Sequence, residues 1–424
     1  MASQSLVKSK YVEQKKLVQK YNSVGIDYFV EQAEIMLNEL KSIRKYMEFN
    51  KFDNTIIHYA QENDLDMAKF IAYLHKEVYK GNYPYKEMMD PDYILENFLQ
   101  SSKSVAGVYE NKMKNKLCGC GIFQLEPENR LAYIRGLMIL NEDRDYIDVK
   151  KIYIQHMYEA IKKNENCIDK IYGEVRTSHN IVQYLSESVG FVPHAILVNK
   201  DNFSGNGIFE SDILAISYTK KCLNEKRYNK PEIHYALFDL YEYFKSIWNL
   251  SKAKFEKPKL NVDKSFTIKA EIESDKIKVK KTFDKYGYIN YKLIHSPTRI
   301  SMNFQVNGIT KSAEKIKFNL LQHDGFISNY LIFASFILKL MELIKSDEIN
   351  YFELYLPCID ANLQEIAMVL GCSVFGFAPA WHKLDNGKLV DCLICGKSKR
   401  EIDLSRMKLT SQSKRLFELI KPFL

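Results

Sequence analysis

Cysteine pairs are the first residues in this sequence whose spacing is typical of site chemistry. Cys392 and Cys395 form a CxxC pair, and a single glycine separates Cys118 from Cys120. A structural zinc site needs a second pair of ligands at suitable spacing, and the sequence offers none. Residues 389–396 have a strand-like composition, which would point the two CxxC thiols to opposite faces. We therefore predict reduced, structural thiols in a cytosolic protein, and no metal.

The charge balance and composition narrow the class of protein. Lys and Arg total 61 against 53 acidic residues, which gives a formal charge of +8 over 424 residues. An excess of this size fits an anionic ligand such as a nucleotide or coenzyme, and DNA is not expected as a partner. Hydrophobic residues make up 46% and charged residues 27%, as in a folded globular protein. With no signal-like N-terminus and no apolar run of about 18 residues, we expect a cytoplasmic protein without a membrane partner.

The elements that must position any site follow from hydrophobic periodicity. A chain of this length exceeds one hydrophobic core and predicts two domains of roughly 150–200 residues. In the first half we expect a helical region over 5–50, strands over 55–60, 105–110, 117–125, 131–140, 170–175, 190–199 and 211–218, and helices over 64–79, 92–100, 147–163 and 180–188. In the second half we expect a connecting helix within 223–257, starting near Pro231, strands over 265–272, 276–281, 288–295, 299–306, 316–321, 351–356, 371–376 and 389–396, and helices over 326–345 and 362–369.

A pattern that occurs twice in the sequence indicates two tandem halves. A strand–turn–helix–glycine–strand unit occurs once in each half, and Glu174 precedes Gly190 by the spacing at which Tyr355 precedes Gly371. The expected fold class is α/β (α+β), with mixed central sheets flanked by helices. The expected parts are an N-terminal helical extension (1–54), a first domain (55–220), a helical linker (221–262), a second domain (263–397) and a basic C-terminal tail (398–424). The tail is expected to end in a short helix, and a solvated tail is favoured over a nucleic-acid-binding arm.

Short segments in the first half, in their order and spacing, resemble a known family. They are Tyr83–Tyr85, Asp90–Tyr93, Arg135–Arg144, Gly173–Asn180, Gly190–Pro193, Asn199–Lys200 and Glu210–Asp212. The stretch 55–220 is similar to the GNAT superfamily of acyl-CoA N-acyltransferases, locally to the β-lysine N-acetyltransferases. The stretch 265–397, through Gly371, Gly376–Trp381 and Asp391, looks like a more divergent copy. The resemblance implies two tandem GNAT-like domains that move an acyl group, most simply acetyl, from acetyl-CoA or another acyl-CoA to a small-molecule amine.

The resemblance also implies a coenzyme site. In the family, two parallel strands splay to admit the pantetheine arm, and a glycine-rich turn opens a helix that binds pyrophosphate. The residues implied for this role are Met138, Ile139, Leu140, Arg144, Val149, Lys150 and Asn180. The turn departs from the family's pattern, because 144–149 reads Arg-Asp-Tyr-Ile-Asp-Val without either glycine, and Asp145 would instead cap the helix. Residues 323–328 stand at the matching place in the second half.

The implied catalytic residues are Glu174, His179 and Tyr184. An amine attacks only after losing its proton, so the family needs a base, and Glu174 ends a strand beside the expected gap. His179, with Asn180, would position the substrate. The family's acidic tyrosine would stand where this chain has Ser186, or Ala367 in the second half, and Tyr184 is the nearest tyrosine. The ordinary alternatives are a solvated strand-end carboxylate for Glu174 and a helix cap for His179.

Several readings stay open at this point. Trp381 and His382 could line a pocket, although packing is the commoner role of a half-buried Trp. The donor could be a carrier-protein-bound pantetheine or an aminoacyl-tRNA, as in Fem-type tandem transferases. The chain could also be a catalytically degenerate binding or sensor protein. Homo-oligomerisation is left open.

Overall fold

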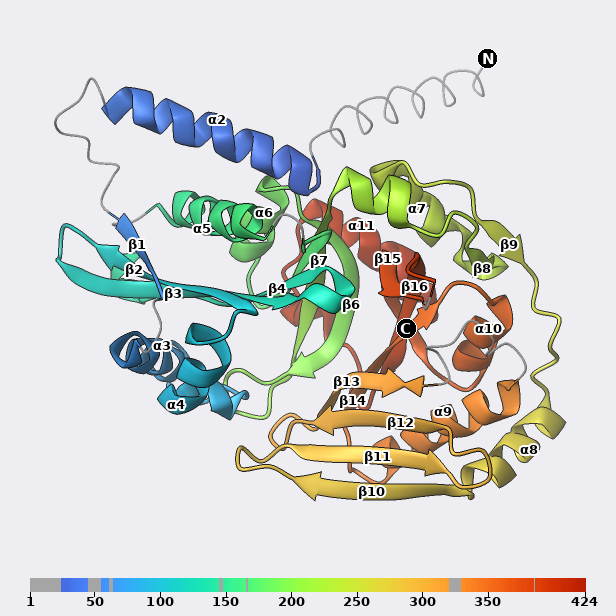
Figure 1. The fold of residues 1–424 in the computed structure, drawn as a ribbon. Helices are drawn as coiled ribbons and strands as arrows, with labels where there is room; N and C mark the ends of the chain where they lie inside the picture. The colour runs from blue at the N-terminus through green and yellow to red at the C-terminus, as the bar shows by residue number, and fades with distance from the viewer. Residues whose placement is uncertain are drawn as a thin grey trace, which may run out of the picture.

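One continuous sheet organises the molecule (Figure 1). The computed structural model describes residues 24–44, 55–60, 64–144, 148–164, 167–319, 329–384 and 386–424. Within them, 14 strands form a mixed sheet with helices packed against it, in the order β1-β2-β3-β4-β5-β7-β6-β15-β16-β14-β13-β12-β11-β10. The prediction of a mixed α/β fold, with helices flanking a mixed sheet, is confirmed.

The first half forms one end of this sheet. Its strands are β1 (Thr55–Tyr59), β2 (Ser104–Asn111), β3 (Lys116–Glu126), β4 (Leu131–Ile139), β5 (Lys170–Arg176), β6 (Val192–Asp201) and β7 (Glu210–Tyr218). Its helices are α2 (Ile26–Arg44), α3 (Leu65–Val78), α4 (Pro91–Ile94), α5 (Val149–Lys163) and α6 (Ile181–Ser188). In Figure 1, α2 and α5 lie above the sheet and α3 and α4 below it. Asp64 caps α3, accepting from the Met67 backbone N–H at 2.9 Å.

The second half repeats the strand order around a parallel pair. Its elements are α8 (Lys264–Ser274), β10 (Ile277–Phe283), β11 (Ile289–His295), β12 (Ser301–Val306), β13 (Ser312–Phe318), α9 (Tyr330–Lys345), β14 (Tyr351–Pro357), α10 (Ala361–Val369), β15 (Ser373–Lys383) and β16 (Leu389–Ser398). Strand β4 runs parallel to β5, which is followed across the sheet by β7 and β6, and β13 runs parallel to β14, which is followed by β16 and β15.

The two halves meet where β6 pairs antiparallel with β15, at Gly376 and Ala195. A Cβ on Gly376 would come within 2.0 Å of the His194 carbonyl oxygen, so only glycine permits this approach. A single apolar core runs across the joint and includes Phe191, Phe244 and Phe377. The sheets expected for two separate domains are therefore joined edge to edge.

The linker and the start of the second half differ from the sequence predictions. The predicted long helix is shorter, α7 (Phe238–Trp248), and lies between two short parallel strands, β8 (Glu232–His234) and β9 (Lys254–Glu256). Residues 265–272, predicted as a strand, lie in helix α8. The carboxylate of Asp263 caps α8 by accepting from the Phe266 N–H at 2.9 Å, and this cap outweighs the local β-branched composition.

The structure also bears on the predictions for the C-terminal tail and the cysteines. The basic tail folds into α11 (Ser411–Ile420), which buries Leu416, Phe417 and Ile420. The structure describes all eight cysteines, and none forms a disulfide. None of the helices in the described part of the chain combines the length and apolarity needed to cross a membrane.

A carboxylate-rich candidate site at the diverging strands

The parallel strands β4 and β5 separate partway along their length. They pair from Leu131 opposite Lys170 to Ile134 opposite Gly173, and no further. Glu174 is the first residue of β5 beyond the last pair. A ladder that opens in this way leaves backbone N–H and C=O groups available to a ligand. A gap between parallel strands is also what the family resemblance implies for this region.

Strands β13 and β14 separate in the same way. Their pairing stops after Ala313 opposite Phe352, so Glu314 and Glu353 are the first residues beyond the last pair. Lys315 follows with a φ of 53°, and the register of β13 against β12 shifts near this point. Each half thus places glutamate side chains where its parallel strands diverge.

Lys200 connects the glutamates of the two halves. Its Nζ donates to Glu174 Oε1 at 2.7 Å and lies 3.8 Å from Glu353 Oε1. The Lys200 side chain is 4% exposed, because it ends the buried strand β6 beside the joint. A single buried ammonium group therefore faces a carboxylate from each half.

Two aspartates adjoin this ion pair. Glu174, Asp201 and Asp212 each offer a carboxylate oxygen, and these oxygens lie within 4.8 Å of one another. The Tyr85 hydroxyl lies 3.0 Å from Asp201 Oδ1 and 2.9 Å from Glu314 Oε1. A hydroxyl has one proton, so it donates to only one of these carboxylates at a time. Asp212 is 1% exposed, and neither of its oxygens finds a donor among the described residues.

The cluster has an excess of acidic groups. Five carboxylates, from Glu174, Asp201, Asp212, Glu314 and Glu353, surround Lys200. The neighbouring guanidinium groups have other partners, because Arg135 binds Glu87 at 2.7 Å and Arg176 binds Glu210 at 2.6 Å.

Burial and like charges perturb these acids. Burial raises the pKa of Asp201 to about 7, and the Glu314 and Glu174 carboxylates add to the rise. Burial also raises the pKa of Asp212 well above its usual range, and the Asp201 carboxylate adds to this rise. The pair therefore retains a proton, or requires a cation, near pH 7.

Aromatic rings from both halves form a band beside the carboxylates on β5 and β14. Tyr133 stacks on Tyr172 with ring centroids 4.7 Å apart, and Tyr355 stacks on Trp381 at 5.0 Å. Tyr172 and Trp381 meet edge to face at 5.4 Å, which joins the two stacks. All four residues are half-buried. Trp381 is thus part of a half-buried aromatic wall, which agrees with the packing role considered from the sequence.

The predicted coenzyme residues lie along β4 and at the start of α5. Met138, Ile139 and Leu140 are buried at the end of β4. Arg144 is exposed and donates from Nε to the Ile139 carbonyl at 3.4 Å. Val149 begins α5, with the exposed Lys150 next to it. Asn180 precedes α6 and makes no side-chain cap.

The predicted start of α5 is wrong. The sequence predicted a start at residue 147, whereas the helix begins at Val149. Asp148 caps it by accepting from the Lys151 N–H at 3.0 Å. Asp145, the predicted cap, lies outside the described residues. Residues 323–328, the matching segment of the second half, also lie outside them.

Only one of the three predicted catalytic residues lies in the cluster. Glu174 does, as described. His179 is half-buried beside Arg176, and burial followed by that guanidinium lowers its pKa, so its ring is neutral at pH 7. The Nδ1 atom of His179 is buried without a hydrogen-bond partner. Tyr184 is 54% exposed on α6, and none of the interactions of the carboxylate cluster involves it.

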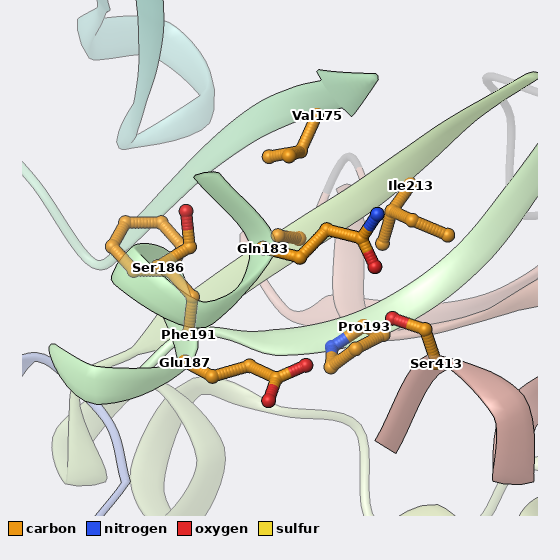
Figure 2. A pocket seen from close by; sticks show the side chains of 9 residues that line it. Val175, Gln183, Ser186, Glu187, Phe191, Pro193, Ile213 and Ser413 are labelled. Atoms are coloured by element: carbon orange, nitrogen blue, oxygen red, sulfur yellow. The ribbon is translucent and has the colours of Figure 1, made fainter. Parts of the chain in front are cut away.

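Ser186, which stands where the family resemblance implies an acidic tyrosine, is buried among packed side chains. Ser186 lines a small void of about 10 Å³ between α6 and α11. Figure 2 shows Gln183 of α6 and Ser413 of α11 on its wall. A void of this size holds at most about one water molecule. It is therefore a packing defect and not a ligand site.

Sequence reasoning assigned no role to Lys200, Asp201, Asp212, Glu314 or Glu353. One signal was available, because Lys200 and Asp201 are charged residues at the end of an otherwise apolar strand. A buried strand that ends in adjacent opposite charges indicates a polar cluster at that edge. Glu314 and Glu353 gave no comparable signal, since their proximity depends on the joint between β6 and β15.

The chain matches no family model and no curated protein. Among solved structures, spermidine N-acetyltransferase from Vibrio cholerae in complex with CoA and spermine is 19% identical, with a TM-score of 0.33, over 40% of this chain and 99% of that chain. The dodecameric form of that enzyme is 18% identical, with a TM-score of 0.32, over 41% of this chain and 99% of its own. Because this similarity is low, we infer the function from the side chains of this chain.

Proposed function

We propose that this chain transfers an acyl group, most simply acetyl, from an acyl-CoA thioester to the amine of a small molecule. The observation that carries the proposal is the carboxylate cluster at the point where β4 and β5 diverge. Its excess negative charge attracts an ammonium group, and the half-buried aromatic wall would contact the carbon skeleton of the acceptor.

The cluster also suits the proton transfers of this reaction. An ammonium group must lose a proton before its nitrogen can attack the thioester carbonyl carbon. A carboxyl such as Asp201, with its pKa held at about 7, exists in both protonation states near neutral pH. Glu174, where β5 leaves β4, is more exposed than Asp201 and is the candidate for direct contact with the amine. The new N–C bond then forms, the C–S bond breaks, and the thiolate leaves and takes up a proton.

We infer further that the recurring strand order reflects two copies of one unit, over 55–220 and 263–397. On this view the acceptor site uses both units, with Glu174, Asp201 and Asp212 from the first and Glu314 and Glu353 from the second. Met138, Ile139, Leu140, Arg144, Val149 and Lys150 remain the proposed contacts to the coenzyme. The unpaired cysteines support a reducing compartment such as the cytoplasm.

A second candidate is a donor other than free CoA, and one observation favours it. Asp148 places a carboxylate at the N-terminus of α5 and accepts from the Lys151 N–H. In a coenzyme-binding helix, that end meets the pyrophosphate. A carboxylate there opposes a phosphate unless Arg144 and Lys150 compensate, so a carrier-protein-bound donor is the alternative.

The test combines coenzyme binding with turnover. Thermal unfolding is recorded with and without acetyl-CoA, since a ligand at 100 times its dissociation constant stabilises by about 2.7 kcal/mol. Thiol release is then followed with a panel of amines, for the native chain, for Glu174→Gln, and for Glu77→Gln as an exposed control on α3. We expect Glu174→Gln to lower turnover by about 10²-fold or more and the control to leave it unchanged. No shift and no turnover on any amine would reject the proposal.

A further inference from the structure

In the second half, one face of the sheet exposes side chains that no helix of the described residues covers. Between β1 and β2 the chain forms α3 and α4, whereas between β10 and β11 it makes only a short turn, in which the Asp284 N–H donates to the Tyr288 carbonyl. The four strands β10, β11, β12 and β13 expose alternate residues on this face. In Figure 1 they lie at the lower edge of the molecule.

Lysines line up across this face. In the strand register Lys280 is opposite Lys292, Lys292 is opposite Asn303, and Asn303 is opposite Lys317. One row across four strands therefore holds three lysines. Like charges directly opposite each other on antiparallel strands are destabilising. A neighbouring anion would remove this repulsion.

The same residues line a hollow of about 500 Å³. Four lysines contribute to it, Lys280, Lys292, Lys315 and Lys317, and none of the described acidic residues does. Its volume lies within the range of small-molecule sites. The rest of its polar lining consists of Thr282, Asn290, Asn303 and Gln305, which offer hydroxyl and amide groups.

The four lysines have no acidic partner among the described residues. This contrasts with Lys281, their neighbour on the other face of β10, whose ammonium group pairs with Glu348. Among the described carboxylates of the candidate acceptor site, Glu314 is the one next to this face. It lies opposite Gln305, in the row beside that of Asn303 and Lys317, and its carboxylate interacts with the Tyr85 hydroxyl. The hollow is thus a concentrated positive field without an internal counterion.

We propose that this hollow binds a small molecule that carries two or three linked phosphates. The phosphate chain lies along the row of Lys280, Lys292 and Lys317, and the amide side chains contact the organic part. The charge favours phosphate, and the size of the hollow favours a nucleotide-sized molecule over a polymer. A nucleic-acid strand would call for exposed aromatic rings to stack on, and the two aromatic residues of the lining, Tyr291 and Phe304, are 3% and 4% exposed and stack on each other on the buried face.

The test is isothermal titration of the full chain with inorganic triphosphate. The variant Lys280→Glu/Lys292→Glu removes the row, and Lys264→Glu/Lys269→Glu on α8 makes the same change in net charge at exposed positions elsewhere. We expect saturable one-to-one binding that weakens with salt, at least a tenfold rise in Kd for the first variant, and less than a twofold change for the second. Lys280→Gln/Lys292→Gln repeats the test without charge reversal.

Three outcomes would overturn the inference. They are the absence of saturable binding, an equal loss in both charge-reversal variants, and tighter binding of a 20-nucleotide single-stranded RNA that displaces triphosphate. The readout is binding alone, so a negative result here is distinct from a failure of the proposed acyl transfer.

Discussion

Replacing Asp212 by Asn should stabilise the protein and weaken its proposed activity. The substitution keeps the shape of the side chain and removes one of two adjacent buried carboxyl groups. Asp212 faces the Asp201 carboxyl, and the new amide can donate to Asp201 in place of a shared proton. The cost of placing two carboxyl groups together therefore falls, while the negative charge that would hold an ammonium group also falls.

The raised pKa of Asp201 sets the pH dependence of stability in the native chain. Its pKa rises from 3.8 to about 7 on folding, and a shift of about 3 units corresponds to roughly 4 kcal/mol. Because this pKa is raised in the folded state, the folded protein holds a proton that the unfolded chain has released. Stability is therefore highest below about pH 4 with respect to this group, and falls as the pH rises towards 7. Between pH 5 and pH 8 the loss should be about 2–3 kcal/mol.

Urea unfolding followed by the fluorescence of Trp248 and Trp381, at pH 5, 6, 7 and 8, measures this dependence. We expect the native chain to lose stability across the series and Asp212→Asn to lose less, because the raised pKa of the Asp212 carboxyl no longer contributes. Asp239→Asn, at an exposed position on α7, serves as the control and should follow the native chain. A flat or rising profile for the native chain, or an unchanged slope in Asp212→Asn, would refute the reasoning.

Two further substitutions test the joint and its ion pair. Lys200→Met leaves Glu174 and Glu353 without their ammonium partner. It should lower the free energy of unfolding at pH 7 by about 3 kcal/mol in urea titrations, and an unchanged midpoint would contradict this. Gly376→Val forces a side chain against the His194 carbonyl oxygen, and should separate the unfolding of the halves into two transitions in calorimetry or limited proteolysis; one native-like transition would show that the joint is not needed.

The sequence predicted elements well wherever local signals agreed. Helix α3 has a capping aspartate, Asp64, and buries one apolar face, and the helix predicted over 64–79 is found at Leu65–Val78. Residues 265–272 combined β-branched side chains with a helical cap at Asp263, and the composition was given too much weight. In the linker, aromatic residues at helical spacing favoured one long helix. They gave no sign of the two short strands beside α7, whose pairing depends on contacts distant in sequence.

The site was predictable only in part, for a geometric reason. Glu174 could be found because it ends a strand beside an expected gap. Asp201 and Asp212 lie on neighbouring strands, and a register shift between Leu197 and Asp201 affects how they face each other. Hydrophobic alternation does not reveal such a shift. The contributions of Glu314 and Glu353 require the joint as well, which depends on the close approach of backbone at Gly376.

The joint between the halves explains why an unfavourable cluster can persist in a stable fold. Buried acids that outnumber their cations cost folding energy, and such groups are retained mainly where a ligand uses them. Here the cost is reduced by Lys200, which faces a glutamate from each half, and by the Tyr85 hydroxyl, which reaches both Asp201 and Glu314. Either half alone would lack part of this compensation. The edge-to-edge sheet therefore creates the candidate site and also makes its excess charge tolerable.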